Sequence, residues 1–275
     1  MIPARAGGLP RPRRLPAILA LAGLALSTPA RAGDDPPAPL QLDLTFSLSL
    51  TGGALAGALA TELLKDRLAP TRCRVCTPGR LDAWLQGELA WSHPGRASTP
   101  SDVLGVGVPA AAAGALALAG WQAGGARTAA EDLLVTAEAT SVAILATQVV
   151  KLSVGRLRPS AYHAPAAPRG PDAFLSFWSG HAAAAFAGAA AAGQVARLRG
   201  YRRWPWILGL GLAGAAACGY LRVAADRHWT TDVLAGAAVG TTAGLGLPVL
   251  LHRPREERTG GLELTVLPSG IAGRF

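Results

Sequence analysis

Six apolar stretches with few charged residues follow one another along the chain. They are Leu44–Leu64, Val103–Trp121, Leu133–Val150, Gly180–Ala196, Trp206–Leu221 and Trp229–Leu251. Most of them approach the length of about 20 residues that a helix needs to cross the hydrocarbon of a bilayer. Leu, Ala and Gly dominate the later stretches, whereas Lys, Asp and Glu are sparse, so this part of the chain is expected to bury its surface in lipid. We therefore predict an all-α integral membrane bundle of five to six helices.

The first stretch is the least typical of a membrane span. Gly52 and Gly53 interrupt it, and Glu62 and Lys65 lie at its end. These features favour an interfacial helix that does not cross the membrane fully. Five crossings, made by the other stretches, are the expectation.

The N-terminus has the pattern of a secretory signal. Basic residues precede the apolar run Leu15–Leu26, and the small-residue pattern Ala30-Arg31-Ala32 follows it. We expect residues 1–32 to be a signal peptide cleaved after Ala32, with an uncleaved anchor as the alternative. Residues 33–102 then hold a Pro-rich linker, the partly spanning helix and an extracytoplasmic loop, residues 103–251 the helical core, and residues 252–275 a polar tail.

The positive charge indicates an orientation rather than a nucleic-acid partner. The net charge is +9, but the arginines lie in short clusters between apolar segments instead of forming one stripe, which argues against nucleic-acid binding. One cluster occupies residues 197–203 and another follows the last helix at residues 253–258. Such loops face the cytoplasm in bacterial inner-membrane proteins. The loops 151–178 and 222–228 are then periplasmic, provided that there are five crossings after signal cleavage or six with an uncleaved N-terminus.

Three short stretches at the outer ends of these helices carry the chemistry. The first contains Lys151 and Arg158-Pro159, and the two cations can converge on one anion if the chain leaves the helix at Gly155. A basic flank at the membrane interface is the alternative, because snorkelling Lys and Arg are common at helix ends.

The second stretch is Ser179-Gly180-His181, directly before the helix-forming Ala182–Ala185. Ser179 is a predicted helix N-cap, and the free N–H groups of the first turn form an anion site together with the helix dipole. Gly180 permits close approach of the backbone to a ligand. His181 can donate a proton to a leaving oxygen, with simple capping of the helix as the alternative.

The third stretch contains Arg222, His228 and Asp232. His228 and Asp232 are four positions apart at a predicted helix start, so the carboxylate is expected to accept an imidazole N–H. The other ring nitrogen is then a lone-pair nucleophile, and Arg222 offers bidentate recognition of phosphate. A structural ion pair is the alternative for His228 and Asp232.

In order, the stretches read Lys-x6-Arg-Pro, Ser-Gly-His and Arg-x5-His-x3-Asp, with helices between them. This arrangement resembles the type-2 phosphatidic acid phosphatase superfamily over roughly residues 131–251. The resemblance implies a phosphate site at the outer membrane face in which Lys151, Arg158 and Arg222 hold the phosphate oxygens, assisted by Ser179 and Gly180.

The resemblance also implies the catalytic roles. His228 attacks phosphorus, Asp232 orients it, and His181 protonates the leaving alkoxide before helping water to hydrolyse the phosphohistidine. Three cations and helix N–H groups suit the charge of the transferring phosphoryl group, so the scheme needs no metal or other cofactor. Trp178 and Leu221 depart from the family pattern, which usually has Pro and Ser at these positions.

The expected substrate is a lipid phosphomonoester or diphosphate. Phosphatidic acid, phosphatidylglycerol phosphate, a polyprenyl diphosphate and a lipid A phosphate all suit an outward-facing membrane site, and the sequence does not choose among them. Phosphotransfer to another acceptor shares the covalent step, and vanadium haloperoxidases share the motifs but are typically soluble. The sequence does not indicate an oligomeric state.

Two further features carry narrower expectations. Cys73 and Cys76 form a single C-x2-C, which favours a disulfide or two free thiols over a zinc site. Glu138 lies within an apolar stretch and is expected to face the bundle, where it could support a basic residue of the site.

Overall fold

The computed structural model describes residues 36–167, 169–253, 263–267 and 270–274. The predicted signal peptide lies outside these residues, and the polar tail is described in part. The elements are α1 (Leu44–Leu63), α2 (Lys65–Leu68), α3 (Arg80–Leu89), α4 (Gly95–Val154), α5 (Pro159–His163), η1 (Pro171–Phe174), α6 (Gly180–Leu198), α7 (Trp204–Ala224), α8 (Thr230–Leu251), β1 (Glu263–Leu267) and β2 (Gly270–Arg274). The strands form an antiparallel hairpin in which Thr265 pairs with Ala272.

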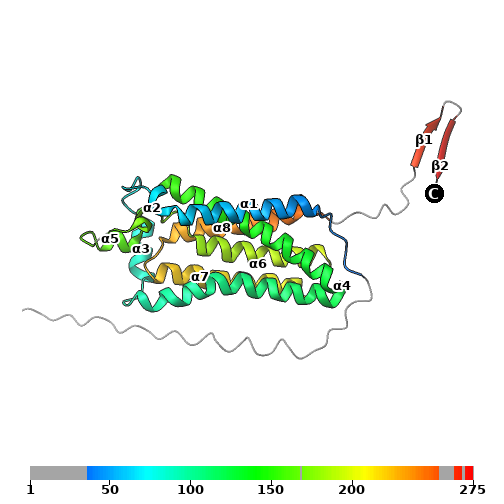
Figure 1. Cartoon of the computed structure of the whole chain (residues 1–275). Helices are drawn as coiled ribbons and strands as arrows, with labels where there is room; N and C mark the ends of the chain where they lie inside the picture. The colour runs from blue at the N-terminus through cyan, green and yellow to red at the C-terminus, as the bar shows by residue number, and fades with distance from the viewer. Residues whose placement is uncertain (1–35, 168, 254–262, 268–269, 275) are drawn as a thin grey trace, which may run out of the picture. The chain divides into compact units, whose positions relative to one another are not determined.

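The chain forms the all-α bundle that the apolar stretches predict (Figure 1). Among the described residues, α1, α4, α7 and α8 are long and apolar enough to cross a membrane. Helix α4 is two antiparallel helices joined at Gly125, whose φ of 77° and ψ of −167° break the helical path. The two predicted stretches around residues 103–121 and 133–150 thus occupy the two halves of α4.

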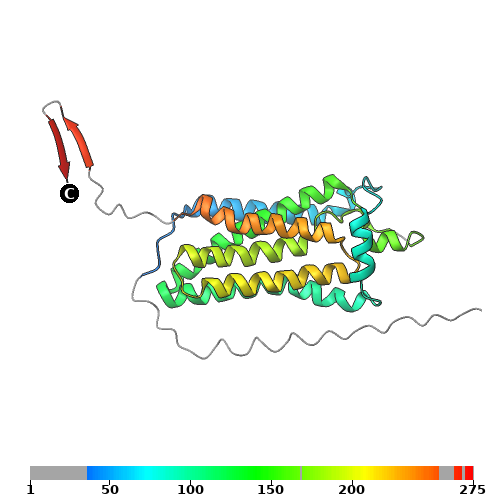
Figure 2. The same ribbon diagram turned by 180° about the vertical axis from the view of Figure 1, so that it is seen from behind.

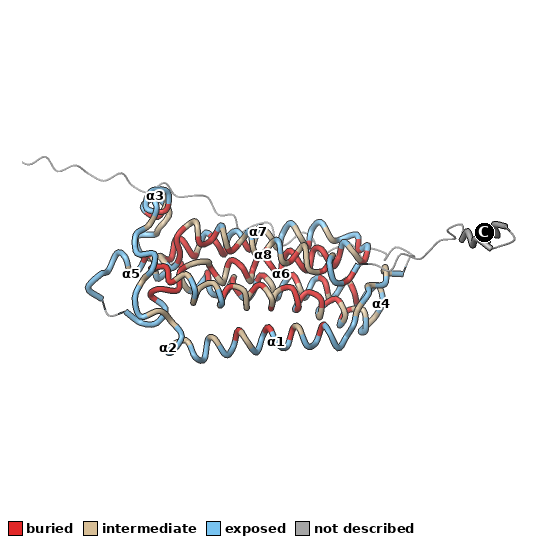
Figure 3. Tube along the Cα trace, turned by 90° about the horizontal axis from the view of Figure 1, so that it is seen from above, coloured by how far each residue is buried: buried red, intermediate tan, exposed pale blue. Residues whose placement is uncertain are grey.

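Helix α6 lies at the centre of the bundle, and its alanine-rich middle is almost wholly buried (Figure 3). Helix α8 approaches it closely through Gly236, Gly240 and Gly244. A Cβ added at Gly240 would lie 2.3 Å from the carbonyl oxygen of Ala183. Small residues permit this close contact, which is how helices associate where lipid offers no hydrophobic driving force between them.

Helix α1 is continuous where the sequence suggested an interruption. It continues without a break through Gly52 and Gly53 and lies along the outside of the bundle against α4 (Figure 3). Its buried face consists of Ser47, Thr51, Ala54 and Ala58, whereas Gly52 and Gly53 lie on the exposed side with open space at their Cβ positions. With the two halves of α4, the bundle contains six long helices.

The two ends of the bundle have different contents. At one end, Arg199 pairs with Asp132 at 2.7 Å, and Tyr201 donates a hydrogen bond to the same carboxylate. The segment before α1 lies at this end too, because the Gln41 N–H donates to the carbonyl of Arg253. At the opposite end, α3 lies across the ends of the bundle helices, beside α5 and the loops that carry the three motifs (Figure 2).

Candidate active site

The first motif loop leaves α4 as predicted. Gly155 adopts a left-handed conformation with φ 61° and ends the helix. The following residues pair with the segment of the Cys73–Cys76 disulfide, since the Arg74 N–H donates to the carbonyl of Gly155 and the Leu157 N–H to that of Val75. The disulfide settles the alternative left open for these cysteines, and its loop supports the chain on either side of Arg156.

Arg158 emerges from this loop toward the centre of the site. Its Nε donates to the carbonyl of Asp172 at 2.8 Å, and its Nη1 donates to the carbonyl of Arg227 at 2.9 Å. The same Nη1 lies 3.3 Å from Nε2 of His228. Burial, and then the charges of Arg222 and Arg227, lower the pKa of Arg158 to about 10, so it remains a cation at neutral pH.

The second motif begins α6 as predicted. Ser179 is the N-cap, with its side chain accepting from the Ala182 N–H. A Cβ added at Gly180 would lie 3.2 Å from Nζ of Lys151, so the ammonium group reaches the N-terminus of α6. Trp178 donates a hydrogen bond from its indole to Thr147 Oγ1 at 2.6 Å, which ties this loop to the end of α4.

His228 is completely buried and oriented differently from the prediction. Its Nδ1 lies 2.8 Å from the carbonyl oxygen of Ser176, whereas the nearest oxygen of Asp232 is 3.8 Å away. Because a carbonyl oxygen only accepts, Nδ1 carries the proton and Nε2 presents its lone pair toward Arg158. The predicted nucleophilic nitrogen is therefore unprotonated, but the backbone carbonyl of Ser176, and not the Asp232 carboxylate, orients the ring.

The electrostatic environment keeps the His228 imidazole neutral. Burial lowers its pKa well below the usual value, and the charges of Arg158, Lys151 and Arg222 lower it further, against a smaller opposing effect of the Ser176 carbonyl. These are the three cations that the sequence assigned to phosphate. Of the three, Arg158 lies in direct contact with the ring.

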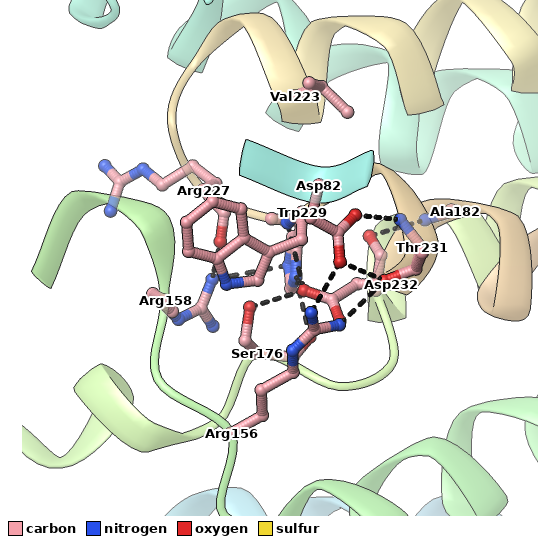
Figure 4. A network of polar contacts seen from close by, with 12 residues as sticks. Asp82, Arg156, Arg158, Ser176, Ala182, Val223, Arg227, Trp229, Thr231 and Asp232 are labelled. Atoms are coloured by element: carbon pink, nitrogen blue, oxygen red, sulfur yellow. Dashed lines mark hydrogen bonds and ion pairs between the residues drawn. The ribbon is translucent and has the colours of Figure 1, made fainter. Parts of the chain in front are cut away.

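Asp232 has other partners. Its carboxylate accepts from the Trp229 N–H at 3.0 Å, from Ser176 Oγ at 2.5 Å and from Arg156 Nη1 at 2.5 Å (Figure 4). It thereby caps the start of α8 and holds the residue whose carbonyl orients His228. Asp232 therefore acts on His228 through Ser176 and not by the predicted direct hydrogen bond.

Arg222 and His181 meet at a shared carboxylate. Arg222 Nη1 donates to Asp102 Oδ1 at 2.5 Å, and Nε2 of His181 lies 3.3 Å from the same oxygen. Leu221 packs against the cluster of Ala97, Ala224 and Ala225. The second departure from the family pattern therefore fills an apolar contact.

The part of the chain that carries the three motifs is similar to known proteins. Residues 132–256 match the profile of the PAP2 superfamily. This part of the chain is similar to that superfamily. The match contains all three motifs with Lys151, Ser179, Arg222, His228 and Asp232.

The chain is also similar to one curated protein and to one solved structure. A curated Lipid A 1-phosphatase of Porphyromonas gingivalis is 39% identical over 94 residues, which are 34% of this chain and 18% of that relative. The chain thus aligns with less than a fifth of the relative's length. The crystal structure of a transmembrane PAP2 type phosphatidylglycerolphosphate phosphatase from Bacillus subtilis covers 74% of this chain and 94% of its own, at 17% identity and a TM-score of 0.44.

Sequence reasoning missed two charged residues that support the PAP2 motifs. Arg156 donates to Asp82 at 2.6 Å and to Thr231 at 2.8 Å in addition to Asp232 (Figure 4). Asp82 on α3 also accepts from the backbone and the hydroxyl of Thr231. Arg156 lies within the first motif, where its charge between Gly155 and Leu157 was a usable signal. Asp82 lies outside the PAP2 match in a segment expected to be a loop, and nothing in its neighbourhood marked it.

The expectation for Glu138 is partly wrong. The side chain faces the bundle interior, as predicted for a charge in an apolar helix. Its partner, however, is His252 after α8, with Nε2 at 3.1 Å from Oε1. Since His252 lies at the end of the bundle opposite the motifs, Glu138 does not support a residue of the site.

Proposed function

We propose that this protein is a membrane-embedded phosphoric ester hydrolase that removes phosphate from a lipid through a phosphohistidine intermediate at His228. The observation that carries the proposal is the orientation of the buried imidazole, with Nδ1 on the Ser176 carbonyl and Nε2 beside Arg158. The PAP2 match and the Lipid A 1-phosphatase relative support the class of reaction.

The proposed reaction uses the imidazole groups of His228 and His181. Nε2 of His228 attacks phosphorus, a P–N bond forms, and the P–O bond to the lipid breaks. His181 gives its proton to the leaving alkoxide. Water then attacks the phosphohistidine after losing a proton to His181, the P–N bond breaks, and phosphate leaves with His228 restored.

The cations supply the electrostatic part of catalysis. Lys151 and Arg158 reach the site from the end of α4 and the loop beyond it, and Arg222 from α7. The N-terminus of α6 at Gly180 adds backbone N–H groups and the positive end of a helix dipole. Preorganised positive charge of this kind stabilises the charge that spreads over the transferring phosphoryl oxygens. We therefore propose a reaction that requires no metal.

The substrate class follows from the membrane setting. The apolar outer surfaces of the long helices indicate a multi-span membrane protein, and the site lies at one end of the bundle. A lipid that carries a phosphomonoester or diphosphate fits this position, with its chain in the bilayer and its phosphate at the interface. Lipid A phosphate is one candidate, with support from the Porphyromonas gingivalis relative, beside phosphatidic acid, phosphatidylglycerol phosphate and polyprenyl diphosphates.

We further propose a bacterial inner-membrane location with the site in the periplasm. The basic residues Arg197, Arg202 and Arg203 lie at the end of α6 and in the loop before α7, at the bundle end opposite the motifs, which favours a cytoplasmic position for that end. Six crossings place the segment before α1 on the cytoplasmic side as well. Six crossings therefore fit the bundle better than the five crossings expected from the sequence.

The proposal is tested by phosphate release in detergent with excess chelator. Full-length protein is offered phosphatidic acid, phosphatidylglycerol phosphate, a polyprenyl diphosphate and a lipid A phosphate, and protein-bound phosphate is trapped by rapid quenching. We expect phosphate release that resists the chelator. The protein-bound phosphate, called the label below, should be stable in alkali and lost in acid, as is typical of phosphohistidine.

His228→Ala is the informative variant, and His93→Ala on the exposed loop before α4 is its matched control. The first variant should lose both release and label, while the second should keep both. Release from no substrate, or an unchanged label in His228→Ala, would show that the nucleophile or the function has been misassigned.

A further inference from the structure

The first half of α4 reaches into the active site although it lies before the PAP2 match, which begins at residue 132. Three of its residues, Ser101, Asp102 and Gly105, share one helix face and contact Arg222 or His181. We call this group the α4 cradle. No motif of the sequence pointed to it.

The cradle holds Arg222 by its terminal nitrogen. Nη1 donates to Ser101 Oγ at 2.9 Å and to Asp102 Oδ1 at 2.5 Å, and the side chain is only 6% exposed. Nε of Arg222 is buried without a hydrogen-bond partner among the described residues. A buried donor of this kind is costly unless a ligand satisfies it, and a phosphate oxygen is a suitable acceptor.

The cradle also fixes the ring of His181. Nε2 lies 3.3 Å from Asp102 Oδ1, and the ring packs directly on the backbone at Gly105. A Cβ added at Gly105 would lie 2.3 Å from Cδ2 of His181, closer than any side chain permits without movement. The imidazole is therefore held from two sides by one helix.

We propose that Asp102 is a positioning residue that holds Arg222 and His181 in a common orientation around the phosphate. This inference rests on the proposed phosphatase function. A carboxylate repels a phosphate anion, so Asp102 acts through its two partners and does not bind substrate. One fixed carboxylate couples the group that binds phosphate to the group that protonates the leaving oxygen.

The proton transfer depends on this carboxylate as well. The charged groups around His181 are Asp102 on the first half of α4, Arg222 on α7, Lys151 at the end of α4 and Arg158 beyond it. Three of the four are cations, which oppose a protonated imidazole, and Asp102 is the anion that compensates them. Its loss should therefore affect the step in which His181 acts as an acid.

The test compares Asp102→Asn with Asp66→Asn, an exposed carboxylate on α2, in full-length detergent-purified protein. For Asp102→Asn we expect kcat to fall about 10- to 100-fold. The alkaline limb of the kcat pH profile should move down by about one pH unit, because the amide no longer favours the imidazolium. Asp66→Asn should match the wild type in both respects.

Gly105→Ala provides a second variant that keeps every charge. Its methyl group must displace the His181 ring, so kcat should fall at least tenfold while the folded protein is retained. Gly114→Ala, on the same half of α4 with open space at its Cβ, is the control and should keep wild-type activity.

The outcomes separate this inference from the proposed function. If the wild type releases no phosphate and forms no phosphohistidine, the proposed function fails. If the wild type does both and Asp102→Asn retains its kcat and pH profile, only the positioning role of Asp102 is refuted. A variant that loses folded protein but keeps the wild-type pH profile also refutes it, since that result shows a structural role alone.

Discussion

At the scale of single residues, a backbone carbonyl orients His228, the proposed nucleophile, and the Asp232 carboxylate makes no direct hydrogen bond to its ring. Asp232 lies 3.8 Å from Nδ1 of His228 and fixes Ser176, which holds the ring. In the proposed reaction, the imidazole becomes positively charged when Nε2 bonds to phosphorus. A buried carboxylate at this distance stabilises that charge without a direct hydrogen bond.

This arrangement predicts unequal effects of two substitutions. Ser176→Ala keeps the carbonyl that orients His228 and removes one hydrogen bond to Asp232, at a cost of about 1 kcal/mol in stability. Asp232→Asn removes the charge that stabilises the phosphohistidine. We expect kcat to fall at least tenfold more in Asp232→Asn than in Ser176→Ala, measured at saturating substrate. Equal losses would mean that orientation through Ser176 is the whole role of Asp232.

The buried His228 also predicts a pH dependence of stability. The folded state holds its pKa well below the value of about 6.5 in an unfolded chain. Between these two values the unfolded state binds more protons, so the free energy of unfolding decreases as the pH falls below about 6.5. At pH 5.5 the loss from this group is about 1.4 kcal/mol at most.

Thermal unfolding in detergent at pH 7.5 and pH 5.5 checks this prediction. The wild type should lose more stability on acidification than His228→Asn, which lacks the titrating group. An equal loss in both proteins would contradict the lowered pKa.

At the scale of elements, two contacts determine where the third motif lies. Helix α3 brings Asp82 to Arg156 and to the first turn of α8, so a segment outside the PAP2 match braces the helix that carries Asp232. Helix α8 in turn lies close against α6 through its glycines. The positions of the motif residues in α6 and α8 therefore depend on Asp82 and on the glycines of α8, which take no part in the proposed reaction.

Gly240→Ala tests the contact between α6 and α8. The added methyl group would meet the carbonyl of Ala183, and separating the helices should cost about 1 to 3 kcal/mol of stability. Gly246→Ala on the same helix has open space at its Cβ and should be neutral or slightly stabilising. Unfolding temperatures of the two variants give the comparison, and equal values would show that the close approach is unimportant.

At the scale of the whole molecule, the motif residues and the basic loop that indicates the orientation lie at opposite ends of one bundle. The motifs, α3 and the disulfide loop lie at one end, while the Arg199 pairs and the segment before α1 lie at the other. Because the bundle has six long helices, the segment before α1 and the residues directly after α8 lie at the same end of it. This arrangement predicts which positions a reagent outside the membrane can reach.

Single-cysteine labelling with a membrane-impermeant maleimide in intact spheroplasts measures the orientation. Ala164→Cys, near the site, should react, whereas Arg202→Cys in the basic loop should be protected until the membrane is permeabilised. Pro39→Cys should also be protected if α1 crosses the membrane. Labelling of Pro39→Cys in intact spheroplasts would restore the five-crossing arrangement with a cleaved signal.

The sequence alone determined the features that depend on local order and composition. Apolar length predicted the helices, Gly155 predicted the exit from α4, and Ser179 predicted the start of α6, because each follows from backbone geometry or from the cost of polar groups in lipid. The three motifs likewise marked the residues that meet around His228.

Tertiary structure decided the partners of these residues. Asp82 and Asp102 come from segments before the PAP2 match, and neither has a local signal, because a carboxylate acquires its role only when folding places a cation beside it. The same reason explains why Ser176 rather than Asp232 orients His228: the spacing of four residues permits a contact, but burial and the competing Arg156 determine which contact forms.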